Sequence, residues 1–338
     1  MSKYEVLQLC EAYKDEWNDC VLNSKLGYVY DFYQMLVKCE YEQSTNLTFA
    51  IKDVKENTIV LIMPLYNRSS ILINDQAGTK SFYCRYGPVI RNGLSKKETI
   101  EIKEIFLKNL KRLLKAYYQK EIFVELAALC SYGFPNYNAV NPLIFWGFEP
   151  RVRYSWIIDL RNDEYTLFEN LNRTTRKSIK RISNESRFFV RESVDESIDL
   201  DFEKFLILSD ETYHRNGIKS KSRDYYWNQF YCINISERRI FFLENIDGKI
   251  PEAALMVHLY KNTARITWVV SADIRNRDVV KFLIYKVMLQ LKSNGTNYLE
   301  MGGAYPYLPI TDKRRGISDF KRSFGGFLHP IYMGYFTL

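Results

Sequence analysis

The chain has 338 residues, of which 46% are hydrophobic and 15% aromatic, and this composition excludes a disordered protein. Because one hydrophobic core rarely extends beyond roughly 250–300 residues, the length predicts two domains. The formal net charge of +8 favours an anionic partner such as a nucleotide, a tRNA or a membrane surface, although the same surplus can serve solubility alone.

The first half of the chain predicts two strands, a long helix and a third strand. Residues 47–52 and 59–66 are apolar runs typical of strands. Ser95 followed by Glu98 has the pattern of a capping box, which begins an amphipathic helix that runs to about Gln119. The short apolar run at residues 122–126 then predicts a strand parallel to the earlier ones, because a long helix connects them.

The second half repeats this order. Two helices, over about residues 165–183 and 199–215, open it, and a third covers about residues 224–232. Strands at 239–244 and 252–260 flank a hairpin turn at Asp247-Gly248, and a further strand covers residues 265–270. A helix over about 278–293 ends at Asn294-Gly295 and leads into a strand at 298–301.

Two antiparallel strands, a helix and a parallel strand therefore occur once in each half, which indicates a duplicated α/β domain. We expect the first domain to cover residues 1–158 and the second to begin at Asp159 and cover residues 159–338, with the final strand able to pack on the first domain. The absence of a low-complexity linker predicts a tight interdomain contact with a groove, a place where ligands commonly bind.

Six cysteines are scattered without paired spacing, which argues against a zinc site and a disulfide framework. The sequence implies no metal and no bound cofactor. The first nine residues lack the features of a signal peptide. The longest apolar stretch, residues 59–65, is far shorter than the ~20 residues of a membrane span. The sequence therefore predicts a cytoplasmic protein with no integral membrane segment, for which any membrane contact would be peripheral.

The segment Phe320-Lys321-Arg322-Ser323-Phe324-Gly325 is the main indication of function. Phe320 and Phe324 lie four residues apart and mark one side of a helical turn as buried, which draws Lys321 toward the interior. A lysine held there suits an anionic ligand or a developing oxyanion, so Lys321 and Phe320 are the predicted catalytic residues. The alternative is that Lys321 and Arg322 form an ordinary solvated surface.

A basic stripe provides a second candidate, because its members share one face at helical spacing: Arg173, Arg176, Lys177, Lys180 and Arg181. This face suits the phosphates of tRNA or of a nucleotide-linked or lipid-linked precursor, and equally a face that is only solvated. Arg176 and Lys177 are its predicted binding residues.

Arg215, at a helix end, either binds phosphate through its guanidinium or caps the helix C-terminus. Tyr226 belongs to an aromatic group with Tyr225 and Trp227 that suits stacking on a base or sugar, although such helices more often pack in a core. Trp268 and Tyr86 complete the predicted substrate-binding residues.

Together these features resemble the Fem-type acyltransferases that build peptidoglycan cross-bridges, and their relatives in the broader GNAT-like group. The resemblance spans nearly the whole chain and rests on four segments: the helix at residues 171–179, the helix end Thr212-Tyr213-His214-Arg215-Asn216-Gly217, the Tyr86-Gly87-Pro88 turn and Phe320-Lys321.

The resemblance implies two tandem GNAT-like domains, each a mixed sheet with flanking helices. It implies an acyl donor that is a co-substrate, either aminoacyl-tRNA or acetyl-CoA, and an acceptor amine on a cell-wall or surface-polysaccharide precursor, used in cell wall biogenesis. Lys321 would then act near the acyl carbonyl or a ligand phosphate, and Arg215 would bind a nucleotide diphosphate. The chain lacks the long helical hairpin of some Fem-like enzymes, so tRNA recognition is expected at the acceptor end.

The acyl donor is the main open choice. No glycine occurs between Ser271 and Gln290, where acetyl-CoA-dependent relatives carry a pyrophosphate-binding loop, and this departure favours aminoacyl-tRNA. No nucleophile motif is present, so direct transfer is expected. Two rivals stay open: an acetyl-CoA-dependent N-acetyltransferase acting on an amino sugar or glycan, and a non-catalytic nucleic-acid or glycan-binding module.

Overall fold

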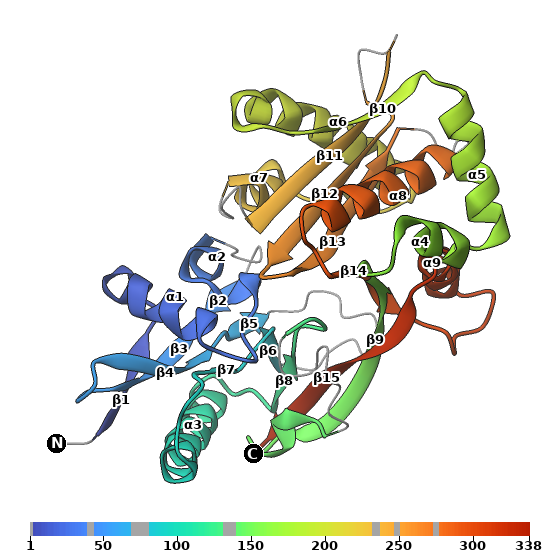
Figure 1. Ribbon diagram of the computed structural model, residues 1–338. Coiled ribbons are helices and arrows are strands. Elements are labelled where there is room, and N and C mark those ends of the chain that lie inside the picture. Colours follow the sequence, from blue (N-terminus) through green and yellow to red (C-terminus); the bar gives the residue numbers. More distant parts are fainter. Residues whose placement is uncertain are drawn as a thin grey trace. The chain divides into compact units, whose positions relative to one another are not determined.

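The polypeptide forms two units and crosses from one to the other twice. The computed structural model describes residues 3–38, 44–68, 81–130, 140–231, 237–246, 251–272 and 277–338. The first unit comprises Met1–Arg153 and Pro330–Leu338, and the second comprises Tyr154–His329. Both crossings lie inside long strands, β9 (Glu149–Asp159) and β15 (Phe327–Thr337) (Figure 1). The first division therefore lies between Arg153 and Tyr154, a few residues before Asp159, the residue at which the second domain was predicted to begin.

The first unit contains two sheets and one long helix. One sheet has the order β1-β3-β4-β7, and the strands of the other follow the order β15-β8-β6-β5-β2. The strands are β1 (Tyr4–Gln8), β2 (Ser44–Asn46), β3 (Phe49–Asp53), β4 (Thr58–Met63), β5 (Tyr66–Arg68), β6 (Ser81–Arg85), β7 (Val89–Ile90) and β8 (Glu121–Glu125). The helices are α1 (Lys14–Leu22), α2 (Tyr33–Lys38) and α3 (Lys96–Ala116), with single turns η1 (Glu11–Tyr13), η2 (Val29–Asp31) and η3 (Pro142–Ile144).

The parallel strand after the long helix has a different partner from the one predicted. Sequence analysis paired residues 122–126 with the strands near residues 47–52 and 59–66, and this is wrong, since those strands are β3 and β4 of the other sheet. The parallel partner of β8 is β6, in register from Ser81 with Glu121 to Arg85 with Glu125. β6 escaped prediction because it is only five residues long and mixes polar with apolar side chains.

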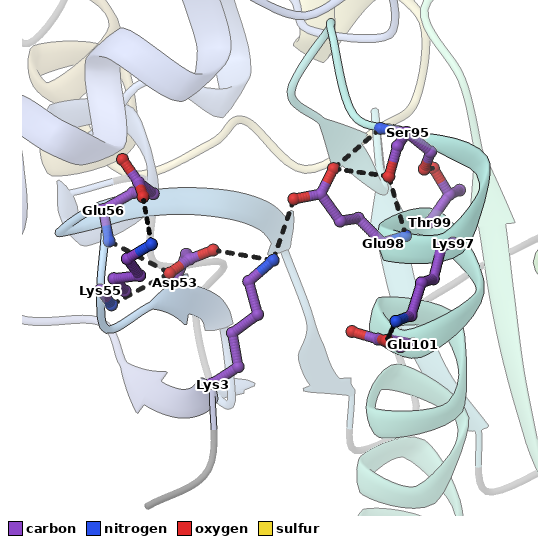
Figure 2. Close-up of polar contacts among 9 residues, drawn as sticks. All are labelled: Lys3, Asp53, Lys55, Glu56, Ser95, Lys97, Glu98, Thr99 and Glu101. Carbon is purple, nitrogen blue, oxygen red and sulfur yellow. Dashed lines mark hydrogen bonds and ion pairs between the residues drawn. The ribbon is translucent and has the colours of Figure 1, made fainter.

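The predicted capping box at the start of α3 is confirmed (Figure 2). The Ser95 hydroxyl accepts a hydrogen bond of 3.2 Å from the Glu98 N–H, and the Glu98 carboxylate accepts one of 2.9 Å from the Ser95 N–H. The Lys3 ammonium lies 2.9 Å from the Glu98 carboxylate and 3.5 Å from that of Asp53 in β3, so it joins the helix start to the sheet. The hydrogen bonds from Lys3 and then Ser95 lower the pKa of Glu98 to about 2.

The second unit contains one mixed sheet of strand order β10-β11-β12-β13-β14-β9. In that sheet β13 and β14 are parallel and joined by α8, and the other neighbours are antiparallel. The strands are β10 (Phe188–Glu192), β11 (Arg238–Asn245), β12 (Ala253–Tyr260), β13 (Thr263–Ser271) and β14 (Tyr298–Ala304). The helices are α4 (Glu164–Asn170), α5 (Arg173–Asn184), α6 (Ile198–Arg215), α7 (Arg223–Tyr231), α8 (Arg277–Ser293) and α9 (Lys313–Arg322), with a single turn η4 (Asp195–Ser197).

Helices cover both faces of this sheet, and the alternation along β12 shows why. Leu255 and Val257 pack in one buried cluster with residues of α5 and α8, whereas Ala254 and Met256 pack in another with residues of α6 and α7. Successive side chains of a strand point to opposite faces, so a strand that is apolar throughout needs a cover on each. Figure 1 shows α8 crossing one face and α6 lying on the other.

Most elements predicted for the second half are present with slightly different bounds. The helix predicted at 165–183 is two helices, because Leu171 is extended and Asn172 caps α5 by accepting a hydrogen bond of 2.8 Å from the Thr175 N–H. The predicted hairpin turn at Asp247-Gly248 lies outside the described residues. In the described part of the chain, no helix is long and apolar enough to cross a membrane, and no cluster of acidic, histidine or cysteine side chains could hold a metal ion.

Candidate active site

The parallel strands β13 and β14 pair only at their beginnings. Their ladder covers Thr263–Arg265 against Tyr298–Glu300, whereas β13 continues to Ser271 and β14 to Ala304. Among the described residues no pairing joins the later parts of the two strands. Diverging parallel strands leave backbone N–H and C=O groups on facing edges without ladder partners, and such groups can bind an extended ligand.

β14 is irregular at the point where it leaves β13. Its register against β9 shifts between Glu300 and Gly302, and Gly302 has a φ of +89°, which a side chain would strain. Gly303 follows directly, so two consecutive residues present bare backbone. A backbone without side chains lets a ligand approach closely.

The Lys321 ammonium lies against this bare backbone. Lys321 Nζ donates a hydrogen bond of 3.1 Å to the carbonyl of Gly303, and a Cβ atom built on Gly302 would lie 3.1 Å from the same nitrogen. The side chain is half-buried. The structure thus places the predicted catalytic lysine beside the part of β14 that no longer pairs with β13.

Packing and hydrogen bonds hold α9, which carries Lys321. Phe320 packs at the edge of the core and contacts the buried Phe324 ring edge to face, with ring centroids 5.4 Å apart. The buried Ser318 hydroxyl accepts hydrogen bonds from the Trp156 indole at 3.1 Å and from the Tyr305 N–H at 2.9 Å. Phe320 therefore has a supporting position in the fold, and the lysine is presented by a helix fixed to β9 and to the segment after β14.

Sequence analysis missed a buried ion pair at the base of the divergence. Arg265 and Glu300 are the last paired residues of the ladder, with 3.3 Å between the Arg265 guanidinium and the Glu300 carboxylate. The Ser155 hydroxyl donates a hydrogen bond of 2.9 Å to the other carboxylate oxygen of Glu300. Glu300 is fully buried, so losing either partner would leave a costly uncompensated charge. The sequence signal for this pair was a single charged residue within each of two mostly apolar strands, Arg265 in β13 and Glu300 in β14.

Arg215 is bound by the end of β13. Its guanidinium donates hydrogen bonds of 3.0 and 2.9 Å to the carbonyls of Ser271 and Ala272, and a third of 3.2 Å to the Ser271 hydroxyl. Thr212, one turn earlier, accepts a hydrogen bond of 2.9 Å from the Ser271 N–H. The predicted phosphate-binding arginine thus serves to fix α6 to the end of β13, close in sequence to the opening between the strands.

The predicted aromatic binding residues form a buried cluster. Tyr226 is fully buried and accepts a hydrogen bond of 2.7 Å from the Ser209 hydroxyl, and burial raises the pKa of its phenol. The half-buried Trp268 contacts the rings of Tyr226, Tyr225 and Phe205 edge to face, with centroids 5.6–6.3 Å apart. Tyr226 is a core residue here, and Trp268 forms the outer part of the same cluster.

Tyr86 lies in the first unit, inside its core. It is buried, has a φ of +73°, and stacks on Tyr30 with ring centroids 4.8 Å apart. The other predicted site residues lie in the second unit.

The basic stripe lies on α5 as predicted, and its members differ in their partners. Arg176 pairs with Glu169, Arg181 pairs with Asp278, and the Lys180 ammonium lies 5.5 Å from the centre of the Phe168 ring. Arg173 and Lys177 are exposed, and neither forms a salt bridge with any described residue. These two cations are the part of the stripe most available to a phosphate.

A carboxylate occupies the first turn of α8. Asp278 accepts hydrogen bonds of 2.5 Å from the Ser178 hydroxyl and 3.2 Å from the Lys281 ammonium, and pairs with Arg181. Burial alone would raise the pKa of Asp278, but these hydrogen bonds and the neighbouring positive charges outweigh it and hold the pKa below its ordinary value. A fixed negative charge at this helix start opposes binding of a second anion there.

Comparisons with known proteins give likeness of fold without likeness of sequence. No protein-family model matches the chain, and no curated protein matches it. The structure of FemX superimposes with a TM-score of 0.69 at 13% identity, covering 97% of this chain and 96% of FemX. The C-terminal domain of a putative lysylphosphatidylglycerol synthetase from Agrobacterium fabrum gives 0.57 at 13% identity, covering 96% and 92%. A tandem GNAT protein from the clavulanic acid biosynthesis pathway gives 0.54 at 10% identity, covering 99% and 98%.

These likenesses confirm the predicted fold class, two tandem GNAT-like domains, and the resemblance to the Fem-type fold. They extend over nearly the whole chain, as the sequence resemblance did. At this level of identity they concern the fold, so activity and substrates are argued from the residues of this chain.

Proposed function

We propose that the protein is an N-acyltransferase that moves an aminoacyl group from aminoacyl-tRNA to an amine of a cell-envelope precursor, with Lys321 at the reacting carbonyl. One observation carries the proposal: the Lys321 ammonium lies against the bare backbone of Gly302 and Gly303, just beyond the last pair of β13 and β14. A cation, glycine backbone without side chains and a strand edge that β13 no longer pairs with together suit an extended acyl donor.

The strand pairing within the first unit supports placing the donor-binding site in the second unit. There the corresponding parallel strands β6 and β8 pair over the full length of both, from Ser81–Glu121 to Arg85–Glu125. The facing edges of β6 and β8 are therefore occupied by the hydrogen bonds between these two strands. The facing edges of β13 and β14 have no such hydrogen bonds beyond Glu300. Of these two pairs, as far as the structure describes their strands, the β13–β14 pair is the one that leaves an edge on which a donor could lie.

The reaction we propose is direct aminolysis of the donor ester. The acceptor nitrogen forms a bond to the acyl carbonyl carbon, the ester C–O bond breaks, and the proton lost by the nitrogen ends on the released hydroxyl of the tRNA. Lys321 stabilises the negative charge that develops on the carbonyl oxygen, an effect worth roughly 3 kcal/mol in a site shielded from water. Holding donor and acceptor together supplies much of the remaining acceleration.

Two features favour an aminoacyl ester over an acyl-CoA donor. The first turn of α8 holds the Asp278 carboxylate, whose charge opposes a pyrophosphate at that position. The sequence from Ser271 to Gln290, which includes the start of α8, also contains no glycine, so it has no glycine loop that could bind phosphates there. Arg173 and Lys177, which have no carboxylate partner among the described residues, suit the phosphates near the acceptor end of a tRNA.

The acceptor is assigned by resemblance and is proposed as a nucleotide-linked or lipid-linked cell-envelope precursor. The names of two similar structures, FemX and a putative lysylphosphatidylglycerol synthetase, support envelope chemistry of this kind. A cytoplasmic location, where aminoacyl-tRNA is made, fits the proposed donor.

Binding of the donor is the first test. Calorimetry at one salt concentration would compare acetyl-CoA, an uncharged tRNA, and the same tRNA carrying an amide-linked aminoacyl group that cannot hydrolyse. We expect salt-dependent binding of both tRNAs, tighter for the aminoacylated form, and no saturable binding of acetyl-CoA. Micromolar binding of acetyl-CoA would instead assign an acetyltransferase.

Transfer is the second test. Protein mixed with tRNA charged with one labelled amino acid at a time should move label to an amine-bearing envelope precursor. Lys321→Ala should slow this transfer by roughly 10²–10³-fold while leaving tRNA binding intact. Binding of tRNA or glycan with no transfer to any precursor, and with Lys321→Ala indistinguishable from the wild type, would indicate a non-catalytic binding module.

A further inference from the structure

The outer face of α3, in the first unit, carries a dense group of cations. Lys108, Lys111, Arg112 and Lys115 are all exposed and recur at helical spacing, so they share one face. They line an open groove of about 620 Å³ together with Leu107 and Glu104. Four positive charges and one carboxylate thus share this face of the helix over about three turns, from Glu104 to Lys115.

Within the described residues these cations have no carboxylate partner. In the described part of the chain none of the four forms a salt bridge, and Arg112 donates hydrogen bonds only to the amide oxygen of Asn109, at 2.9 and 3.1 Å. The first turns of the same helix differ, since Glu98 pairs with Lys3 and Glu101 lies 4.0 Å from Lys97 (Figure 2). The charge of α3 is therefore balanced at its beginning and positive along its second half.

Exposed apolar side chains lie in a segment that contacts α3 at Lys103 and at Leu107, the apolar residue of the groove. Ile144 and Phe145, in and directly after η3, are 50% and 44% exposed. The Lys103 ammonium lies 4.7 Å from the centre of the Phe145 ring, and Trp146 packs edge to face on the buried Phe106 of α3. The segment is thus anchored on α3 by Trp146, and its exposed Phe145 lies beside Lys103 on the flank of the helix next to the cationic face.

We propose that this combined face, formed by Lys108, Lys111, Arg112, Lys115, Ile144 and Phe145, binds the surface of a membrane that contains anionic lipid. Anionic headgroups attract clustered lysines and arginines, and exposed aliphatic and aromatic side chains gain by entering the boundary of the acyl chains. A nucleic acid would satisfy the cations but would give the exposed isoleucine no favourable surroundings. The two kinds of side chain together favour lipid.

Vesicle co-sedimentation tests this with the whole protein. We expect binding to vesicles of phosphatidylcholine mixed with phosphatidylglycerol, weak binding to phosphatidylcholine alone, and release as salt is raised. Lys111→Glu with Lys115→Glu should weaken binding at least about tenfold, since each neutralised lysine near an anionic surface accounts for about a fivefold change. Phe145→Ser should weaken binding with less dependence on salt.

The matched control is Lys96→Glu with Lys97→Glu, which changes the net charge equally at the other end of α3. If this control weakens vesicle binding as much as the Lys111 and Lys115 variant, the attraction is a property of net charge and the proposal is overturned. Equal binding to neutral vesicles, or none to either kind, also overturns it. Loss of tRNA binding in the Lys111 and Lys115 variant with vesicle binding unchanged would assign the face to nucleic acid.

The outcome is separable from the proposed activity. Transfer to a water-soluble, nucleotide-linked acceptor should be the same in the wild type and in the Lys111 and Lys115 variant. The substituted residues belong to the first unit, whereas Lys321 belongs to the second. Failure of transfer would therefore leave the membrane result standing, and failure of vesicle binding would leave the transfer result standing.

Discussion

Lys321 reaches from α9 to the backbone of Gly303 in β14, where its ammonium donates a hydrogen bond of 3.1 Å to the carbonyl. This contact joins a residue near the end of the chain to the strand that diverges from β13. It places a positive charge where β14 no longer pairs with β13 but still pairs with β9.

Replacement of Lys321 should affect chemistry more than folding. Lys321→Ala is expected to lower kcat by roughly 10²–10³-fold, the usual loss when one charge-stabilising donor is removed. Lys321→Arg should recover little, because a planar guanidinium cannot take the place of a compact ammonium against the glycine backbone. Single-turnover rates with preformed complex measure the step directly. An unchanged rate in Lys321→Ala would remove the lysine from the mechanism.

Gly302 should be required for the position of Lys321. Gly302→Ala forces a side chain into a φ of +89° and brings its Cβ to 3.1 Å from the Lys321 nitrogen. Gly295→Ala is the matched control, since Gly295 has a φ of +83° but nothing within 4 Å of a built Cβ. Both should lose about 1–2 kcal/mol of unfolding free energy, and only Gly302→Ala should also lower the transfer rate. Equal rates in the two variants would contradict a positional role.

Arg215 is expected to act through stability. Arg215→Ala breaks the hydrogen bonds to the carbonyls of Ser271 and Ala272 and should lower the unfolding free energy by about 2 kcal/mol, as for charged hydrogen bonds generally. Chemical denaturation measures the loss, and Arg215→Lys should fall between the two. A variant of normal stability that binds a nucleotide-linked precursor more weakly would instead restore the phosphate-binding role predicted from the sequence.

The two exposed cations of α5 should govern the salt dependence of tRNA binding. Reversal of both, Arg173→Glu with Lys177→Glu, should weaken tRNA binding and reduce the slope of log affinity against log salt by roughly 1.5, about 0.7–0.9 for each lost phosphate contact. The variant Lys96→Glu with Lys97→Glu in the first unit changes the net charge equally and serves as the control. A slope that is unaltered in the α5 variant would show that the stripe is only solvated.

The pKa of Glu98 predicts an acid-dependent contribution to stability. Hydrogen bonds from Lys3 and Ser95 lower it from 4.5 to about 2 in the folded protein, so the stabilisation is complete above pH 4.5 and is lost as the pH falls toward 2. Glu98→Gln should therefore unfold more easily than the wild type at neutral pH, and the two should converge in acid. Thermal unfolding across this pH range measures the difference.

The control for that measurement is Glu101→Gln on the same helix. The Glu101 carboxylate lies 4.0 Å from Lys97 on the exposed surface, and such pairs contribute little. Its unfolding temperature should stay close to that of the wild type at every pH. If Glu98→Gln behaves in the same way, the capping box and the Lys3 pair do not stabilise the start of α3.

Local patterns in the sequence were enough to predict the elements whose causes are local. Ser95 and Glu98 cap α3 through bonds that span three residues. The apolar runs at β11 to β14 are short and bounded by turn residues, which favours strands over buried helices. Phe320 and Phe324 likewise indicated, by their spacing alone, a lysine held at the edge of a core. The order of these elements was sufficient to suggest the tandem fold.

The tertiary structure decided what depends on residues distant in sequence. The partner of β8, the end of the β13–β14 ladder at Arg265 and Glu300, and the bonding of Arg215 to the end of β13 all arise from contacts between separate elements. No spacing within one segment encodes such contacts, because each depends on which strand or helix arrives alongside. The chemistry predicted for Lys321 thus came from its neighbours in sequence, and its place beside Gly303 came from the fold.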